Sequence, residues 1–151
     1  MSGRMLGPGR YGLAALQVGD RIETGRRHVS TALIDAFAEM TGDRFEIHMD
    51  KKAAQRHGFA ARVAHGLLVL SMVDGLKNQA GAQFEAMASL GWDWEFTGPV
   101  LAGDTIGVMI TVEALRATSD GKRGVATLRF DVTNQRGETV QRGTNALMVY
   151  V

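Results

Sequence analysis

The first half of the chain contains a stretch whose apolar residues recur at helical spacing. Leu33, Phe37 and Met40 fall at positions i, i+4 and i+7, which places them on one face of a helix. Ser30 stands before this stretch, and serine is a preferred residue at a helix N-cap. Gly42 follows it, where a residue in the left-handed conformation commonly ends a helix. The pattern therefore predicts a helix that begins after Ser30 and ends before Gly42.

A second helical stretch, GLLVLSMVDGLKNQ, covers residues 66–79 and is apolar around most of its circumference. A helix of this kind is typically buried, so we expect it at the centre of the fold. Gly75 lies inside it, where glycine costs about 1 kcal/mol relative to alanine. We therefore expect another part of the protein to pack closely against the backbone at Gly75. Between the two long helices, residues 49–57 carry a shorter helical pattern that ends at Gly58.

The second half of the chain changes from helical spacing to alternation, which is typical of β-strands with one buried face. Three segments alternate, with apolar residues at Trp92, Trp94 and Phe96; at Ile106, Val108, Ile110 and Val112; and at Ala126, Leu128, Phe130 and Val132. Residues 138–151 are also rich in β-forming types, and the turn sequences TGPVLAGD, SDGKRG and NQRGE separate the segments. A further strand is expected near residues 21–27. Helices followed by antiparallel strands predict an α+β fold, in which one curved sheet covers the long apolar helix.

Length and composition are those of one ordinary globular domain, with 151 residues, 45% of them hydrophobic and 22% charged. We expect residues 18–151 to form this domain. Residues 1–17 are Gly-rich and lack the apolar core of a signal peptide, so we expect a loose N-terminal arm. The formal net charge of +1 comes with no basic cluster, so nucleic-acid binding is not expected, although single arginines can still hold a phosphate-bearing ligand.

The absence of cysteine and of long apolar runs indicates which cellular compartment to expect for the protein. Without cysteine there is no disulfide, no thiolate metal site and no cysteine nucleophile, and the composition suits a reducing cytoplasm. The most apolar run, residues 66–73, is far shorter than the roughly 20 residues that span a bilayer. We expect a cytoplasmic protein without a membrane partner.

The stretch TGDRFEIHMD, residues 41–50, places Asp43 and His48 five positions apart directly after the first predicted helix. This spacing does not put two side chains on one helical face, but a corner after a helix end can bring them together. An Asp–His pair in contact can fix the imidazole tautomer, whereas two separate groups can share acid and base roles on a bound substrate. From these residues alone, a capped helix followed by a solvated loop is the simpler explanation.

His65 and Gly66 stand at the start of the predicted buried helix, where the first backbone N–H groups have no partner within the helix. Together with the helix dipole, these groups suit developing negative charge, such as that on the oxygen of a polarised thioester. A glycine here lets a ligand approach the backbone closely. The alternative is structural: Gly66 makes a tight entry into the core, and His65 caps the helix or packs.

Histidine and carboxylate residues also offer metal ligands, in the set Asp43, His48, His57 and His65. Their spacing matches no familiar zinc pattern such as H-E-x-x-H, and no residues that would hydrogen-bond to such ligands and orient them are evident. We therefore expect no metal.

Asp74 interrupts the buried helix, where it shares a face with Ser71 and Asn78. An isolated buried carboxylate is costly, so this face is expected to meet water, a partner chain or a polar site. A solvated or dimer-facing stripe is the simpler of these explanations.

Residues 37–70 resemble the MaoC-like dehydratase family, whose members include (R)-specific enoyl-CoA hydratases. The family motifs are an S/T-G-D at a helix end, an N-P-I-H or N-P-L-H, and an R-I/V-x-H-G-M/L-L segment. This chain has Thr41-Gly42-Asp43, then Ile47-His48, then the segment Ala61–Leu68, ARVAHGLL. Downstream, FTGPVLAGDTI resembles the family's F-x-x-P-V-x-x-G-D strand entry. The resemblance extends from about Val18 to the C-terminus.

The resemblance implies a hot-dog fold, in which an antiparallel sheet wraps a long helix, assembled as a homodimer by edge pairing or as a larger oligomer of dimers. It implies reversible hydration of a trans-2-enoyl-CoA to an (R)-3-hydroxyacyl-CoA, a reaction of fatty acid metabolism that needs no cofactor. Carried over by position, Asp43 and His48 activate water and handle the α proton. The Gly66 N–H donates to the thioester oxygen.

The chain departs from the family pattern at two places. Phe45-Glu46 replaces the usual Asn-Pro, and Asp74 stands where hydratases often have serine. Phe45, His65 and Asp74 are therefore additional candidates for substrate contact. Two other functions remain open: a hot-dog acyl-CoA thioesterase, for which Asp74 is the candidate carboxylate, and a non-catalytic acyl-CoA-binding subunit.

Overall fold

Five strands form one antiparallel sheet in the structure, a computed structural model that describes residues 3–151. The order β2-β5-β6-β7-β4 leaves β2 and β4 at the two edges. The strands are β2 (Arg21–His28), β4 (Ala86–Phe96), β5 (Thr105–Ala117), β6 (Arg123–Thr133) and β7 (Thr139–Tyr150). The predicted α+β class is confirmed and every predicted strand region is found, although β4 begins at Ala86, before the alternation that starts at Trp92.

The alternation along β5 and β6 separates the side chains between the two faces of the sheet, because successive residues of a strand point to opposite sides. All eight apolar residues predicted to face inward are buried: Ile106, Val108, Ile110, Val112, Ala126, Leu128, Phe130 and Val132. The inner face of the sheet is therefore a continuous apolar surface that requires a cover.

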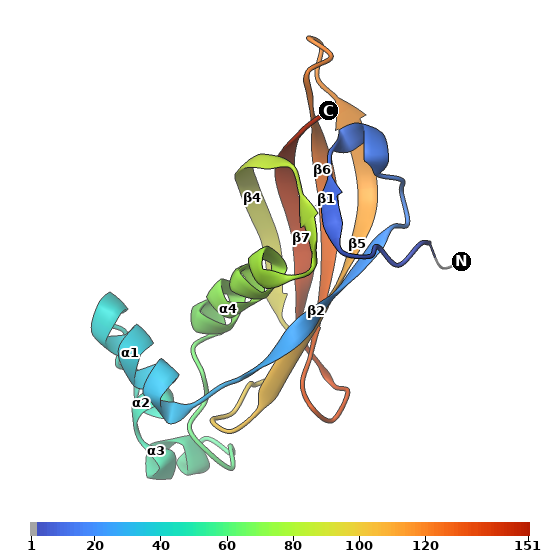
Figure 1. The fold of residues 1–151 in the computed structure, drawn as a ribbon. Coiled ribbons are helices and arrows are strands. Elements are labelled where there is room, and N and C mark those ends of the chain that lie inside the picture. Colours follow the sequence, from blue (N-terminus) through green and yellow to red (C-terminus); the bar gives the residue numbers. More distant parts are fainter. Residues whose placement is uncertain (1–2) are drawn as a thin grey trace.

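Helix α4 (Gly66–Gln79) provides this cover, and it contacts β2 and β5 (Figure 1). Its bounds are those predicted from the sequence. Its apolar side is buried through Leu68, Val69, Met72, Val73 and Leu76. The expectation of burial around most of its circumference is wrong, because Leu67 and Ser71 are exposed on the opposite side. Across residues 3–151, no helix is long and apolar enough to cross a membrane.

Helix α1 (Thr31–Thr41) begins and ends where the sequence predicts. The Ser30 hydroxyl accepts the Leu33 N–H at 3.1 Å as the N-cap, and Gly42 ends the helix with a left-handed φ of 79°. Met40 was expected in the buried stripe, but it is 74% exposed. The residues of α1 that pack against the core or are buried lie between Leu33 and Ala38, so the helix end at Met40 extends beyond this contact.

Two short helices, α2 (Glu46–Met49) and α3 (Lys51–Arg56), replace the single helical pattern expected over residues 49–57. Asp50 separates them because its backbone is extended and its carboxylate accepts two N–H groups in the first turn of α3. Figure 1 shows α1, α2 and α3 gathered beyond the start of α4, away from the sheet. The break at Asp50 lets α2 turn independently of α3.

The N-terminal segment is ordered against the rest of the protein, so the expectation of a loose arm is wrong for residues 3–17. Residues 1–2 of that arm lie outside the described residues. The strand β1 (Gly9–Tyr11) pairs in parallel with β3 (Ala82–Phe84), and a 3-10 turn, η1 (Leu13–Ala15), follows.

Two further contacts hold this segment in place. The guanidinium of Arg4 lies 2.7 Å from the buried carboxylate of Asp20, and Leu6 packs against the core. A three-residue strand and one ion pair leave no periodic pattern in the sequence, which explains why this segment was not predicted.

Gly75 lies within α4 without a close neighbour at the position where a side chain would begin. A Cβ atom built there meets no atom within 4 Å. The expected close contact against the backbone at Gly75 is therefore absent from the described part of the chain.

Replacing Gly75 with alanine is expected to stabilise the protein by about 0.5–1 kcal/mol, because alanine favours helix and restricts the unfolded chain. Denaturant unfolding would measure the change. The same substitution at Gly42, where φ is 79°, serves as the control and should destabilise by about 1 kcal/mol. A loss of stability in Gly75→Ala would show instead that another surface, such as a second copy of the chain, covers this position.

Candidate active site

A cavity of about 360 Å³ lies at the start of α4, and both His48 and Gly66 line it. Helix α2 supplies His48, and the first residue of α4 supplies Gly66. Phe96 at the end of β4, residues 97–100 of the following loop and Gln141 of β7 line it as well. The structure thus brings together His48 and Gly66, which have 17 residues between them in the sequence.

The His48 imidazole is held in one tautomer by the backbone. Its Nδ1–H donates to the Val63 carbonyl oxygen at 2.7 Å, which leaves Nε2 with a free lone pair. The Arg62 Nε–H donates to the His48 carbonyl at 2.6 Å, and the Val63 N–H donates to the Ile47 carbonyl at 3.0 Å. These three bonds connect α2 to the segment that leads into α4.

Burial lowers the pKa of His48 below its ordinary value of about 6.5. The nearby charges of His65 and Arg62 also lower this pKa, whereas the bond to the Val63 carbonyl and the charge of Asp43 raise it and offset part of the shift. His48 is therefore uncharged at neutral pH, and its Nε2 can accept a proton.

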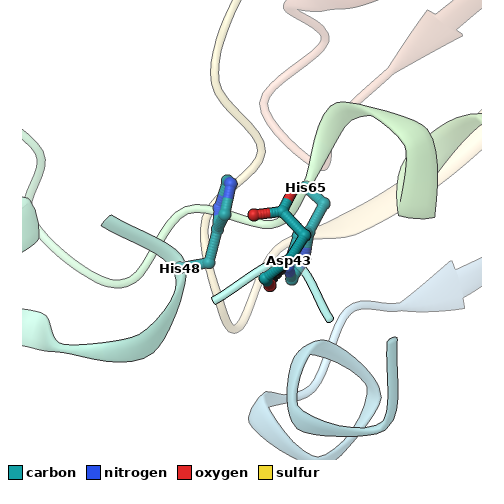
Figure 2. Close-up of side chains that lie close together, drawn as sticks. All are labelled: Asp43, His48 and His65. Carbon is teal, nitrogen blue, oxygen red and sulfur yellow. Dashed lines mark hydrogen bonds between the residues drawn. The ribbon is translucent and has the colours of Figure 1, made fainter. Parts of the chain in front are cut away.

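Asp43 lies in the turn after α1, and Figure 2 shows its carboxylate turned toward His48. One carboxylate oxygen accepts the Phe45 N–H at 3.2 Å, and the Asp43 N–H donates to the Thr41 hydroxyl at 3.2 Å. The carboxylate lies within 4.8 Å of a His48 ring nitrogen without a hydrogen bond between them. Because Val63 fixes the tautomer, the geometry favours two separate groups that act together on a bound molecule.

His65 holds the Asp43 turn from the protein interior. It is 2% exposed, its Nε2–H donates to the Asp43 carbonyl oxygen at 2.9 Å, and its ring stacks on His48 with 3.9 Å between centroids. His65 is not among the residues that line the cavity. Its position is that of a packing residue, which is the structural alternative raised by the sequence.

Asp43, His48 and His65 are also the group of potential metal ligands found within residues 3–151. The two imidazole rings are stacked, with 3.9 Å between centroids and 25° between planes, so their lone pairs lie in two separate and nearly parallel planes. One ion at coordination distance cannot lie in both ring planes, as imidazole coordination requires. This donor set does not suit a metal ion.

The Gly66 N–H has no hydrogen-bond partner in the described part of the chain, and it lies at the positive end of the α4 dipole. A Cβ atom on Gly66 would come within 2.4 Å of the Phe96 ring. The sequence suggested that glycine is needed here for the approach of a ligand. In the structure, the Phe96 ring leaves no room for a Cβ atom at this position, so glycine is needed even without a ligand.

Gln141 of β7 is a site residue that the sequence reasoning missed. Its side chain is 2% exposed and lines the cavity. Its Nε2–H donates to the Gly66 carbonyl at 3.1 Å, and its Oε1 accepts the Trp94 indole N–H at 2.8 Å. The signal that could have revealed it is a polar residue at an inward-facing position of an alternating strand.

Phe45 and Asp74, the other candidates for substrate contact, differ in their relation to the cavity. Phe45 is 55% exposed and presents its ring edge to His48, with 6.0 Å between centroids. Asp74 lines a separate cavity of about 270 Å³, where its carboxylate lies 3.1 Å from the buried ammonium of Lys77. Phe45 therefore borders His48, whereas Asp74 is not among the residues around His48 and Gly66.

Comparisons with known proteins show the family and the fold of the chain. A sequence model of the MaoC like domain matches residues 14–134. The chain is 40% identical over 105 residues to protein MaoC of Klebsiella aerogenes, a region that covers 69% of this chain and 31% of that protein. It is 30% identical over 131 residues to the (R)-specific enoyl-CoA hydratase of Aeromonas caviae, covering 85% of this chain and 92% of the hydratase.

A third relative is the mitochondrial 3-hydroxyacyl-acyl-carrier-protein dehydratase of Arabidopsis thaliana, 33% identical over 105 residues that cover 70% of this chain and 61% of that protein. The chain thus spans about a third of the length of protein MaoC and less than two thirds of this dehydratase.

Solved structures extend the likeness to three dimensions. The monoamine oxidase regulatory protein of Archaeoglobus fulgius superposes with a TM-score of 0.86 at 30% identity, covering 96% of this chain and 98% of that one. A Mycobacterium tuberculosis protein described as a double hotdog fold superposes with a TM-score of 0.81 at 23% identity, covering 96% of this chain and 44% of that one. With its sheet, its covering helix and the match over residues 14–134, the chain has a hot-dog fold and belongs to the MaoC-like dehydratase family.

Proposed function

We propose that this protein is an acyl-CoA hydratase/dehydratase that interconverts a trans-2-enoyl-CoA and an (R)-3-hydroxyacyl-CoA. The observation that carries the proposal is that His48, with a free Nε2, and Gly66, whose N–H has no partner among the described residues, line one cavity. The Asp43 carboxylate is not among the lining residues, but it lies within 4.8 Å of a His48 ring nitrogen. The names of two relatives, an (R)-specific enoyl-CoA hydratase and a 3-hydroxyacyl-acyl-carrier-protein dehydratase, support the same type of reaction.

Each group has a distinct task in the proposed reaction. The Asp43 carboxylate accepts one hydrogen of a water molecule and orients it, while His48 Nε2 removes the other as the water oxygen bonds to C3. The electron pair of the double bond moves toward C2 and the thioester oxygen, where the Gly66 N–H donates to the developing charge. His48 then returns the proton to C2. Water supplies both added hydrogens, so the proposal includes no cofactor.

The carrier and the assembly are also part of the proposal. We take the carrier to be coenzyme A, as the name of the Aeromonas relative indicates for that protein, whereas the Arabidopsis relative is named for an acyl carrier protein. Among residues 3–151, the edge strand β4 has a sheet partner on one side only, and it exposes Met87 and Leu90. An exposed apolar edge favours pairing with another chain, so we propose a cytoplasmic homodimer joined through β4.

Two other functions predict different products. A thioesterase needs a carboxylate beside the thioester, and Asp74, the candidate for that role, lines a separate cavity. A binding subunit without catalysis has some support, because one solved relative is described as a regulatory protein. Free thiol released from an acyl-CoA would identify the first function. Thermal stabilisation by acyl-CoA without turnover would identify the second.

Purified protein is expected to hydrate crotonyl-CoA, followed by the loss of enoyl absorbance, and chiral chromatography should identify the product as (R). Asp43→Asn and His48→Ala should each lower kcat/KM by about 10²–10⁴-fold, because each removes a positioned acid–base group. His57→Ala and Asp93→Asn remove the same residue types at positions that neither line the cavity nor belong to the Asp43, His48 and His65 group, and they should change kcat/KM by less than about threefold. Equal activity in all four variants would refute the assigned roles.

The pH dependence of His48 provides a second test. Its imidazole should titrate by NMR with a midpoint below about 6.5, and the acid limb of kcat/KM should follow the same midpoint. Asp43→Asn should lower this midpoint further, because the Asp43 charge raises the His48 pKa. The unfolded chain takes up this proton at a higher pH than the folded protein, so His48 should reduce stability as the pH falls from about 6.5 through the folded pKa. A titration midpoint of His48 above 6.5 would contradict the conclusion that burial lowers its pKa.

A further inference from the structure

We propose that Gln141 is a positioning residue that orients the Gly66 N–H toward the thioester oxygen. It connects the first residue of α4 to the end of the edge strand β4, through the Gly66 carbonyl on one side and the Trp94 indole on the other. The inference rests on the proposed role of the Gly66 N–H. It assigns a role to a residue of β7, whereas the other groups with assigned roles come from residues 43–66.

The orientation of the Gln141 amide follows from its two partners. An indole N–H can only donate and a backbone carbonyl can only accept, so Oε1 must face Trp94 and Nε2 must face Gly66. The side chain is 2% exposed and has little contact with water to replace either partner. The amide therefore has one orientation, and that orientation fixes the distance between β4 and the start of α4.

Gly66 needs such restraint more than another residue would. Glycine has wide backbone freedom, and the first turn of a helix is held by fewer hydrogen bonds than its interior. Gln141 holds the Gly66 carbonyl, while the Phe96 ring packs against the Gly66 α carbon. Phe96 and Gln141 are direct partners in the β4–β7 ladder, so one register position of the sheet holds the glycine from two sides.

The structure also supplies a matched control at the other end of the same helix. The Gln83 amide donates to the Lys77 and Ala80 carbonyls at 3.2 and 2.6 Å, so it too holds backbone of α4 or its C-cap. Gln83 lines the separate cavity and is absent from the cavity of His48 and Gly66. Loss of either amide weakens a contact to α4, but only loss of Gln141 should disturb Gly66.

The kinetic test compares Gln141→Leu with Gln83→Leu in the full chain, using crotonyl-CoA. Both substitutions are expected to lower Tm to a similar extent. Gln141→Leu should lower kcat by about 10- to 100-fold with KM within about threefold, because a displaced donor acts mainly on the transition state. Gln83→Leu should keep kcat within about threefold of wild type. A similar kcat in the two variants would overturn the proposal.

A second measurement reports on Gly66 without turnover. Butyryl-CoA is a saturated thioester that cannot be hydrated, and its addition should move the wild-type Gly66 amide proton downfield as that N–H gains an acceptor. The shift should fall to less than half in Gln141→Leu and persist in Gln83→Leu. An equal shift in all three proteins, or none in wild type, would overturn the inference. Wild type that shows the Gly66 shift but does not hydrate enoyl-CoA would refute only the proposed function.

Trp94→Phe tests the same connection if Gln141→Leu does not fold. Phenylalanine keeps an aromatic ring and leaves the bond from Gln141 to Gly66, but it removes the indole N–H that holds Oε1. We expect a severalfold loss of kcat and a reduced butyryl-CoA shift at Gly66. Wild-type values for both would overturn the proposal.

Discussion

The packing of α4 against the inner face of the sheet is the contact on which the rest of the structure depends. It buries the apolar side of the helix, from Leu68 to Leu76, against alternating residues of the strands. Hydrophobic burial is not directional, so it fixes where the helix lies without fixing the orientation of its first peptide groups. Directional hydrogen bonds fix that orientation. Gln141 donates to the Gly66 carbonyl, and His65, the residue before Gly66, donates to the carbonyl of Asp43.

The two side chains to which we assign proton transfer, Asp43 and His48, are positioned through backbone carbonyls. Val63 fixes the His48 tautomer, and His65 holds the Asp43 turn through its carbonyl. Asp43 and His48 therefore do not hydrogen-bond to each other. The carboxylate of Asp43 and the Nε2 of His48 both remain available to a bound molecule. Partial burial of the ring then keeps His48 uncharged at neutral pH. The protonation state of His48 and the position of Asp43 therefore depend on Val63 and His65, in the segment that leads into α4, as well as on the two side chains themselves.

The sequence predicted features that local rules control. Ser30 and Gly42 mark the ends of α1, and the bounds of α4 were predicted from its apolar stretch alone, because caps and periodicity act over a few residues. The family resemblance brought Asp43, His48 and Gly66 into one site before the fold was known. Its motifs reach the sheet at Phe96, the end of β4, but do not include Gln141.

Features that depend on distant parts of the chain were missed or mistaken. Gln141 is 75 positions from Gly66, and only the β4–β7 register brings it there. The close contact expected at Gly75 occurs at Gly66 instead, since the identity of a glycine does not reveal which neighbour lies against it. The short pairing of β1 with β3 is equally non-local.

The cavity has walls from two parts of the chain that meet at Gly66. One wall comes from residues between Ile47 and Ala64, including His48, and the other comes from Phe96, residues 97–100 and Gln141. A substitution in the strand ends can reshape the space offered to a substrate without touching the groups that handle protons. Asp43 and His48 are thus encoded in a different stretch of the gene from most of this second wall, so single mutations can change the shape of the cavity while the Asp43–His48 pair is inherited intact.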